Sequence, residues 1–264
     1  MDVLALKPGL RQLCDDELGH PSVSGMTIGV PWSKVNPRPN EFRFSIIDSA
    51  IERARRLNKG IVGLQIHTGA GDASPTWLRG EWITCEGHDA PAPWNRSMLQ
   101  ALSALANRIS LFFGNDGFQR VHVTGPTWSH TAFAGAPGLE TKHGYSQCAY
   151  LSAWKEAFDI WHEAFPQAKL VLAIQPDAID ESMLDEIVRY ALTLCVDKLV
   201  LELDDFDSRT QDISRLEPYI TEGAQLRFAL ATQLNRLNIR NLLDAAVKYG
   251  AESVDVRPAD IKYV

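Results

Sequence analysis

The sequence has few cysteines and no arrangement of them that binds a metal. Only four cysteines occur in 264 residues, at Cys14, Cys85, Cys148 and Cys195. None belongs to a CxxC pair or has a histidine at zinc-finger spacing. We therefore predict no metal site and no cofactor. We interpret the four cysteines as free, buried thiols.

Long apolar runs and an excess of positive charge are also missing. No apolar stretch approaches the ~20 residues that a membrane helix needs, and the first residues lack a cationic segment followed by an apolar one. The net charge is -7, whereas nucleic-acid binding needs clustered lysine and arginine. We expect a cytoplasmic protein that binds neither nucleic acid nor membrane. The sequence leaves the oligomeric state open.

Short runs rich in Val, Leu and Ile alternate with longer helical stretches, a pattern typical of βα units around a parallel sheet. The predicted strands are Val3–Leu6, Met26–Trp32, Ile61–His67, Val121–Gly125, Leu170–Gln175, Leu199–Asp204, Leu226–Gln233 and Ser253–Pro258. The predicted helices are Ser45–Leu57, Arg96–Phe113, Ser146–Phe165, Ser182–Leu194 and Ile239–Tyr249. Eight such strands with right-handed crossovers close into a barrel of about 250 residues. We predict an α/β fold, a (β/α)8 TIM barrel, with residues 1–264 as one domain.

The longest non-helical stretch runs from Thr68 to Asn95 and contains three tryptophans. It follows the third predicted strand, at the end where barrel enzymes bind their substrates.

Several motifs resemble the second to fourth strands of retaining glycosidase barrels. In the segment Val30–Asp48 (VPWSKVNPRPNEFRFSIID), a strand ending in tryptophan leads through an Asn-Pro turn to a Phe-x-Phe motif and a helix. The segments Lys59–Gly69 (KGIVGLQIHTG) and Ser74–Leu78 (SPTWL) are similar to the third strand of that family and its loop. Pro93-Trp94-Asn95 and Val123–Pro126 (VTGP) are similar to its approach to strand four.

The resemblance implies two catalytic carboxylic acids, one at the end of strand four and one at the end of strand seven. Thr131 and Gln233 align with these two positions. Neither side chain can donate a proton to a glycosidic oxygen or form the usual glycosyl ester. Standard retaining hydrolysis is therefore not expected from these positions.

Alternation along the predicted strands indicates which side chains face the barrel axis. The polar residues assigned to the inside are Gln65, His67, His122, Thr124, Gln175, Glu202, Asp204, Gln233, Ser253, Asp255 and Arg257. Two interpretations stay open. In one, Glu202 and Asp255 belong to a buried ionic network and lie beside Arg257 or a histidine. In the other, Asp204 forms a displaced acid/base pair with Glu202 or Asp255 below it.

These patterns define a candidate site at the carboxyl ends of the strands. The candidate catalytic residues are Asp204, Glu202, Asp255 and His67, the histidine as a substitute proton donor. The candidate saccharide-binding residues are Trp32, Trp77, Trp94, Trp128, His130, Gln175, Gln233 and Arg257. Tryptophan rings suit the apolar faces of pyranose rings, although each could instead pack a loop.

We predict a carbohydrate-active, glycoside-hydrolase-like barrel that binds a saccharide, with the displaced carboxylates as its candidate hydrolytic groups. Two alternatives are a catalytically inactive sugar-binding protein and a barrel enzyme that acts on another polar small molecule, because fold alone does not determine function.

Overall fold

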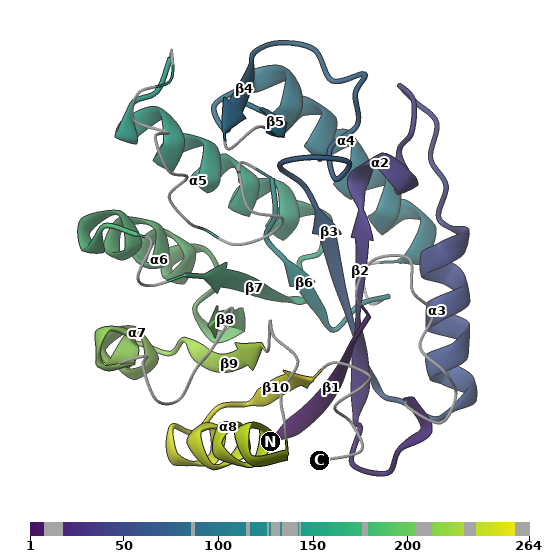
Figure 1. Cartoon of the computed structure of the whole chain (residues 1–264), viewed down its shortest axis with the longest axis vertical. Helices are drawn as coiled ribbons and strands as arrows, with labels where there is room; N and C mark the ends of the chain where they lie inside the picture. The colour runs from purple at the N-terminus through teal and green to yellow at the C-terminus, as the bar shows by residue number, and fades with distance from the viewer. Residues whose placement is uncertain are drawn as a thin grey trace.

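Eight parallel strands form a closed barrel in the computed structural model (Figure 1). The structure describes residues 1–7, 18–85, 88–114, 117–125, 127, 133, 142, 144–175, 179–203, 213–229 and 236–256. The barrel strands are β1 (Asp2–Lys7), β2 (Gly25–Pro31), β3 (Ile61–His67), β6 (Arg120–His122), β7 (Lys169–Ile174), β8 (Leu199–Leu203), β9 (Gln225–Ala229) and β10 (Ser253–Val256). The first strand, β1, pairs with β10 as well as with β2, and this pairing closes the barrel.

Helices surround these strands as a ring (Figure 1). They are α3 (Ser45–Arg56), α4 (Arg96–Phe113), α5 (Gln147–Ala164), α6 (Glu181–Cys195), α7 (Glu217–Thr221) and α8 (Arg236–Lys248). Shorter elements are α2 (Trp32–Val35) and the 3-10 turns η3 (Val196–Lys198) and η4 (Ser214–Leu216). None of the helices in the described segments has the length and apolar character that crossing a membrane requires.

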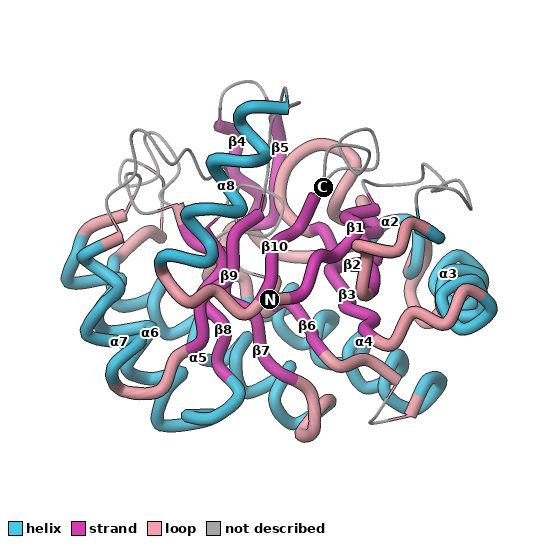
Figure 2. Tube along the Cα trace, turned by 90° about the horizontal axis from the view of Figure 1, so that it is seen from below, coloured by secondary structure: helices cyan, strands magenta, loops and turns pink. Residues whose placement is uncertain are grey.

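An antiparallel hairpin lies outside the barrel, between β3 and α4. It consists of β4 (Trp82–Cys85) and β5 (His88–Pro91). Figure 2 shows it beyond the end of the barrel at which the strands finish. The hairpin therefore belongs to the face where barrel proteins bind their ligands.

Apolar side chains on the outer face of the barrel pack against the helices. On β8, Leu199, Leu201 and Leu203 belong to the main apolar core, whereas Val200 and Glu202 between them do not. The same alternation holds on β9, where Leu226 and Phe228 face this core. Because successive side chains of a strand point to opposite faces, the remaining residues face the barrel axis.

The closed barrel confirms the predicted TIM fold, with a few local corrections. Trp32 begins α2 and does not end β2. The stretch after β3, predicted only to be non-helical, contains the hairpin, whose short strands have a weak sequence signal and were not predicted. The short helix α7 was not predicted. Cys148 is exposed, so the prediction that it is buried is wrong, whereas Cys195 is buried.

We predict that Gly25→Ala lowers the free energy of unfolding by about 2 to 3 kcal/mol. A Cβ atom at Gly25 would lie 2.0 Å from the backbone oxygen of Ile61, the residue paired with it on β3. Gly60 precedes Ile61, and a Cβ atom there would meet nothing within 4 Å. Urea unfolding of both variants tests this difference. An equal effect of Gly25→Ala and Gly60→Ala would contradict the prediction.

Candidate functional site

The inside of the barrel is lined mainly by polar side chains. In a typical barrel of this type, bulky branched apolar residues fill that space. The buried polar residues on the axis side of the strands, or directly after them, are Thr27, Gln65, Arg120, His122, Thr124, Glu202, Arg227, Ser253 and Asp255. Side chains from strands far apart in the sequence therefore meet in this interior.

Arg227 on β9 joins two carboxylates inside the barrel. Its Nε atom lies 2.8 Å from Oε2 of Glu202 on β8, and its Nη2 atom is paired with Oδ2 of Asp255 on β10. The same nitrogen donates a hydrogen bond of 2.8 Å to the hydroxyl of Thr27 on β2. Arg227 is 0% exposed. One guanidinium group thus connects four strands of the barrel.

His122 on β6 completes this buried network. Its Nε2 atom lies 3.1 and 3.2 Å from the two carboxylate oxygens of Glu202. Its Nδ1 atom lies 3.3 Å from the backbone oxygen of Leu64. A carbonyl oxygen and an ionised carboxylate only accept hydrogen bonds, so both ring nitrogens of His122 face acceptors. His122 thus links β6 to β8.

The two carboxylates differ in their ionisation. Burial acts to raise the pKa of Glu202, but the attraction of His122 and Arg227 outweighs it and lowers that pKa to about 2. Burial also raises the pKa of Asp255 above its usual value. Attraction to Arg227 offsets only part of that rise, and repulsion from Glu202 adds to it. Glu202 is therefore the better stabilised of the two charges.

A second set of ion pairs lies at the opposite, amino-terminal end of the barrel. Arg120, at the start of β6, lies 3.2 Å from Glu252 and 3.6 Å from Asp2. Lys169, at the start of β7, also pairs with Glu252. Burial lowers the pKa of Arg120, and repulsion from Arg227 lowers it further. Ion pairs therefore occupy the amino-terminal end of the described barrel.

This geometry favours the buried ionic network over the displaced catalytic pair for Glu202 and Asp255. These residues are only 2% and 1% exposed, whereas a catalytic acid or base has to reach the proton that it transfers. Glu202 and Asp255 were predicted to lie beside Arg257 or a histidine. Glu202 does lie beside His122, both carboxylates pair with Arg227, and Arg257 lies outside the described residues. Sequence reasoning missed Arg227, although its place between Leu226 and Phe228 on an alternating strand marks it as facing inward.

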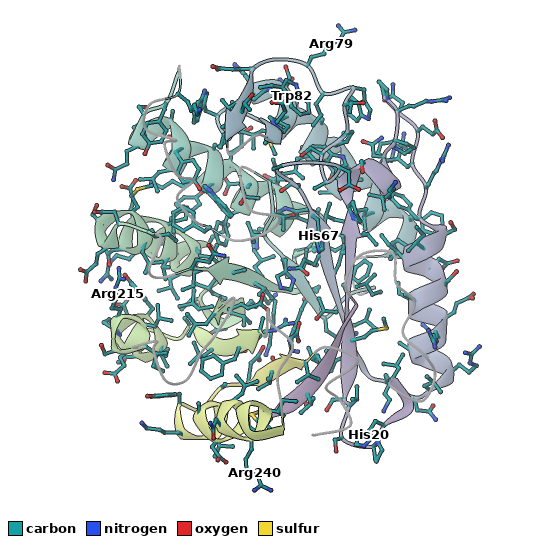
Figure 3. The ribbon with its side chains drawn as sticks, in the orientation of Figure 1. His20, His67, Arg79, Trp82, Arg215 and Arg240 are labelled. Carbon is teal, nitrogen blue, oxygen red and sulfur yellow. The ribbon has the colours of Figure 1, made fainter. Side chains whose placement is uncertain are left out.

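His67 lies at the carboxyl end of β3, closer to the mouth of the barrel. Its Nε2 atom lies 3.4 Å from Oε1 of the buried Gln65, and His67 itself is partly exposed. In Figure 3 it lies within the ring of helices, whereas Arg215 and Arg240 lie at the outer edge. Gln175, directly after β7, is also partly exposed. His67 and Gln175 are therefore less buried than the side chains of the network.

Buried Asn36 organises the loop after β2. Its side-chain oxygen accepts a hydrogen bond of 3.3 Å from the indole of Trp32, and its amide donates to the backbone oxygens of Arg38 and Glu41 at 2.8 Å. Its backbone oxygen accepts a hydrogen bond of 2.9 Å from the indole of Trp77, in the loop after β3. Trp32 is 0% exposed, whereas Trp77 is partly exposed.

A second buried asparagine, Asn95, holds the start of α4 to the preceding loop. Its side-chain oxygen caps α4 by accepting hydrogen bonds from Ser97 and Met98. Its amide donates to the backbone oxygens of Arg79 and Glu81 at 2.9 and 3.1 Å. The adjacent Trp94 donates its indole N–H to Oε2 of Glu81 at 3.1 Å. Both asparagines come from the motifs that resemble glycosidase barrels.

The fold of this chain is similar to that of known proteins, whereas its sequence matches none of those compared. No model of a known protein family matches the chain, and no curated protein sequence does. The catalytic domain of a β-amylase from Paenibacillus polymyxa has a TM-score of 0.71 at 11% identity, over 98% of this chain and 92% of that one. Xylanase 10B from Thermotoga maritima has a TM-score of 0.56 at 14% identity, over 88% of this chain and 74% of that one.

Another similar structure is xylanase 10B from Thermotoga petrophila in complex with xylobiose. Its TM-score is 0.57 at 13% identity, over 97% of this chain and 81% of that one. This chain is a TIM barrel with a fold similar to that of these β-amylase and xylanase structures. At these identities the similarity establishes the fold of the barrel and leaves its ligand to be tested.

Several predicted site residues lie outside the described residues. They are Asp204, Trp128, His130, Gln233 and Arg257, together with Thr131, which aligns with a catalytic acid. Within the described segments, no group of three or more His, Cys, Asp or Glu side chains is arranged to hold a metal ion.

The network predicts how the stability of this barrel depends on pH. The lowered pKa of Glu202 contributes stability that is present above about pH 4.5 and is lost as pH falls toward 2. The raised pKa of Asp255 acts in the opposite direction, because the folded state then binds the proton more readily. Asp255→Asn removes this opposing effect and a negative charge near Glu202. Between pH 5 and 3, we expect Asp255→Asn to lose more unfolding free energy than the wild type, with Glu202 accounting for about 2 kcal/mol.

Urea unfolding at pH 5, 4 and 3 measures this difference. Asp197→Asn, at an exposed position in η3, is the matched control and should keep the pH dependence of the wild type. A shallower pH dependence in Asp255→Asn than in the wild type would contradict the described network.

Proposed function

We propose that this protein binds a saccharide at the carboxyl-terminal face of its barrel. The observation that carries the proposal is the position of Trp77, a partly exposed ring fixed at the mouth through its hydrogen bond to Asn36. His67 and Gln175 are partly exposed at the same end of the barrel. The β-amylase and xylanases with this fold, one solved with xylobiose, support a carbohydrate over other polar ligands.

The chemistry of these groups suits a sugar ring. The indole N–H of Trp77 is already used by the backbone oxygen of Asn36, so the exposed part of the ring offers apolar surface and not a donor. The C–H groups on one face of a pyranose pack against such a ring. An imidazole and a carboxamide both donate and accept hydrogen bonds, as sugar hydroxyls require. Fixing Trp77 in advance also reduces the entropy lost on binding.

Saccharide binding in this proposal does not depend on Glu202 and Asp255. Both carboxylates are buried and paired with Arg227, which favours a binding function without a displaced acid/base pair formed by these two groups. Asp204, which directly follows β8, is the remaining candidate among the acids predicted to catalyse hydrolysis.

A glycan array followed by titration calorimetry on the best ligand tests the proposal. We expect Trp77→Ala to weaken binding about tenfold or more, because it removes the stacking surface. Trp77→Phe keeps an aromatic face and should lose less. Phe112→Ala is the control, because Phe112 is an exposed ring at the far end of α4 and should not affect binding. Binding of no glycan, or equal binding by Trp77→Ala and the wild type, would overturn the proposal.

A further inference from the structure

A second aromatic surface lies apart from Trp77, between the loops after β3 and β6. Trp94 precedes α4, and Tyr145 precedes the N-cap of α5. Their ring centroids are 5.7 Å apart and their planes meet at 67°. Both side chains are partly exposed. The two rings therefore meet at an angle, and we call the surface that they form the Trp94–Tyr145 corner.

Contacts with the surrounding loops hold this corner rigidly. The indole N–H of Trp94 donates to Oε2 of Glu81 at 3.1 Å, and the backbone oxygen of Glu81 accepts from the amides of Asn95 and Ala92. Gly144 has a φ of 75° and approaches so closely that a Cβ atom there would lie 2.8 Å from the indole nitrogen. Glycine therefore allows the loop after β6 to close against Trp94.

The corner shares an end of the barrel with Trp77 and lies over the next pair of strands, because β3 stands between β2 and β6 in the barrel. In a βα unit the helix runs back along its strand, so the N-termini of α4 and α5 lie at the carboxyl ends of the strands. Trp77 connects the loops after β2 and β3 through Asn36. The corner instead connects the loops after β3 and β6. A ligand that reaches both must extend from the loops after β2 and β3 to those after β3 and β6.

We propose that the Trp94–Tyr145 corner is a second saccharide subsite, which binds an oligosaccharide already held at Trp77. The proposal rests on the saccharide binding proposed above. Two rings set at 67° offer one apolar face to a pyranose and an edge beside it. The Glu81 carboxylate fixes the Trp94 ring of this corner by accepting its indole N–H. The subsite therefore favours longer chains over disaccharides.

Calorimetry with paired probes tests this subsite: xylobiose against xylohexaose, and maltose against maltohexaose. In the series that binds, we expect Tyr145→Ala and Trp94→Ala each to weaken hexasaccharide binding about tenfold while changing disaccharide binding less than twofold. Tyr145→Phe keeps the ring and should bind like the wild type. Phe112→Ala, at the opposite end of α4, is the control for loss of an aromatic ring.

The outcomes separate the subsite from the proposed function. If the hexasaccharide binds no tighter than the disaccharide and Tyr145→Ala has no effect, the subsite is wrong while saccharide binding stands. If no probe of either series binds, both proposals fail for these sugars. Should Trp94→Ala fail to fold, Tyr145→Ala remains as the test of the subsite. In a folded Tyr145→Ala protein, equal losses for short and long probes would also overturn the subsite.

Discussion

The ion pairs of Arg227 with Glu202 and Asp255 are the interaction on which the barrel interior depends. A charge buried without a partner costs several kcal/mol, and all three of these side chains are almost fully buried. They come from adjacent strands β8, β9 and β10, and Arg227 also reaches Thr27 on β2 across the barrel. Polar contacts therefore specify the inside of this barrel, while the apolar core lies between the strands and the helices. A shift of one strand by one residue would leave these charges without partners.

In the proposed function, this division of the molecule leaves the mouth of the barrel for ligand binding. The buried network uses the charged groups of β8, β9 and β10 within the described barrel, so a ligand meets the loops and the strand ends above them. Two buried asparagines give these loops a defined shape. Asn36 joins the loops after β2 and β3, and Asn95 joins the loop after β3 to α4. The partly exposed rings of Trp77 and Trp94 are thus held in place by hydrogen bonds without a ligand. Such preorganisation lowers the entropic cost of binding.

Much of this architecture could be predicted from the sequence because it follows from periodicity. Alternation along β8 identified Glu202 as an inward-facing residue, and the Asn-Pro turn marked the loop that Asn36 organises. Periodicity alone did not identify the partners in the network. Arg227 pairs with residues 25 and 28 positions away and with Thr27 at 200 positions, and only the closed barrel brings these strands together. The hairpin β4–β5 and the contact of Trp94 with Tyr145 depend on loop geometry, for which the sequence has no regular repeat.

The most direct test of this account compares two arginines that each pair with two carboxylates. Arg227 does so inside the barrel, and Arg189 does so with Asp185 and Glu222 on the exposed surface. The measurement is the free energy of unfolding in urea at pH 7. We predict that Arg227→Met loses about 3 to 5 kcal/mol, because two buried carboxylates lose their partner. Arg189→Met should leave stability nearly unchanged, because exposed ion pairs contribute little. Equal, small effects of both substitutions would contradict the claim that the buried network holds the barrel together.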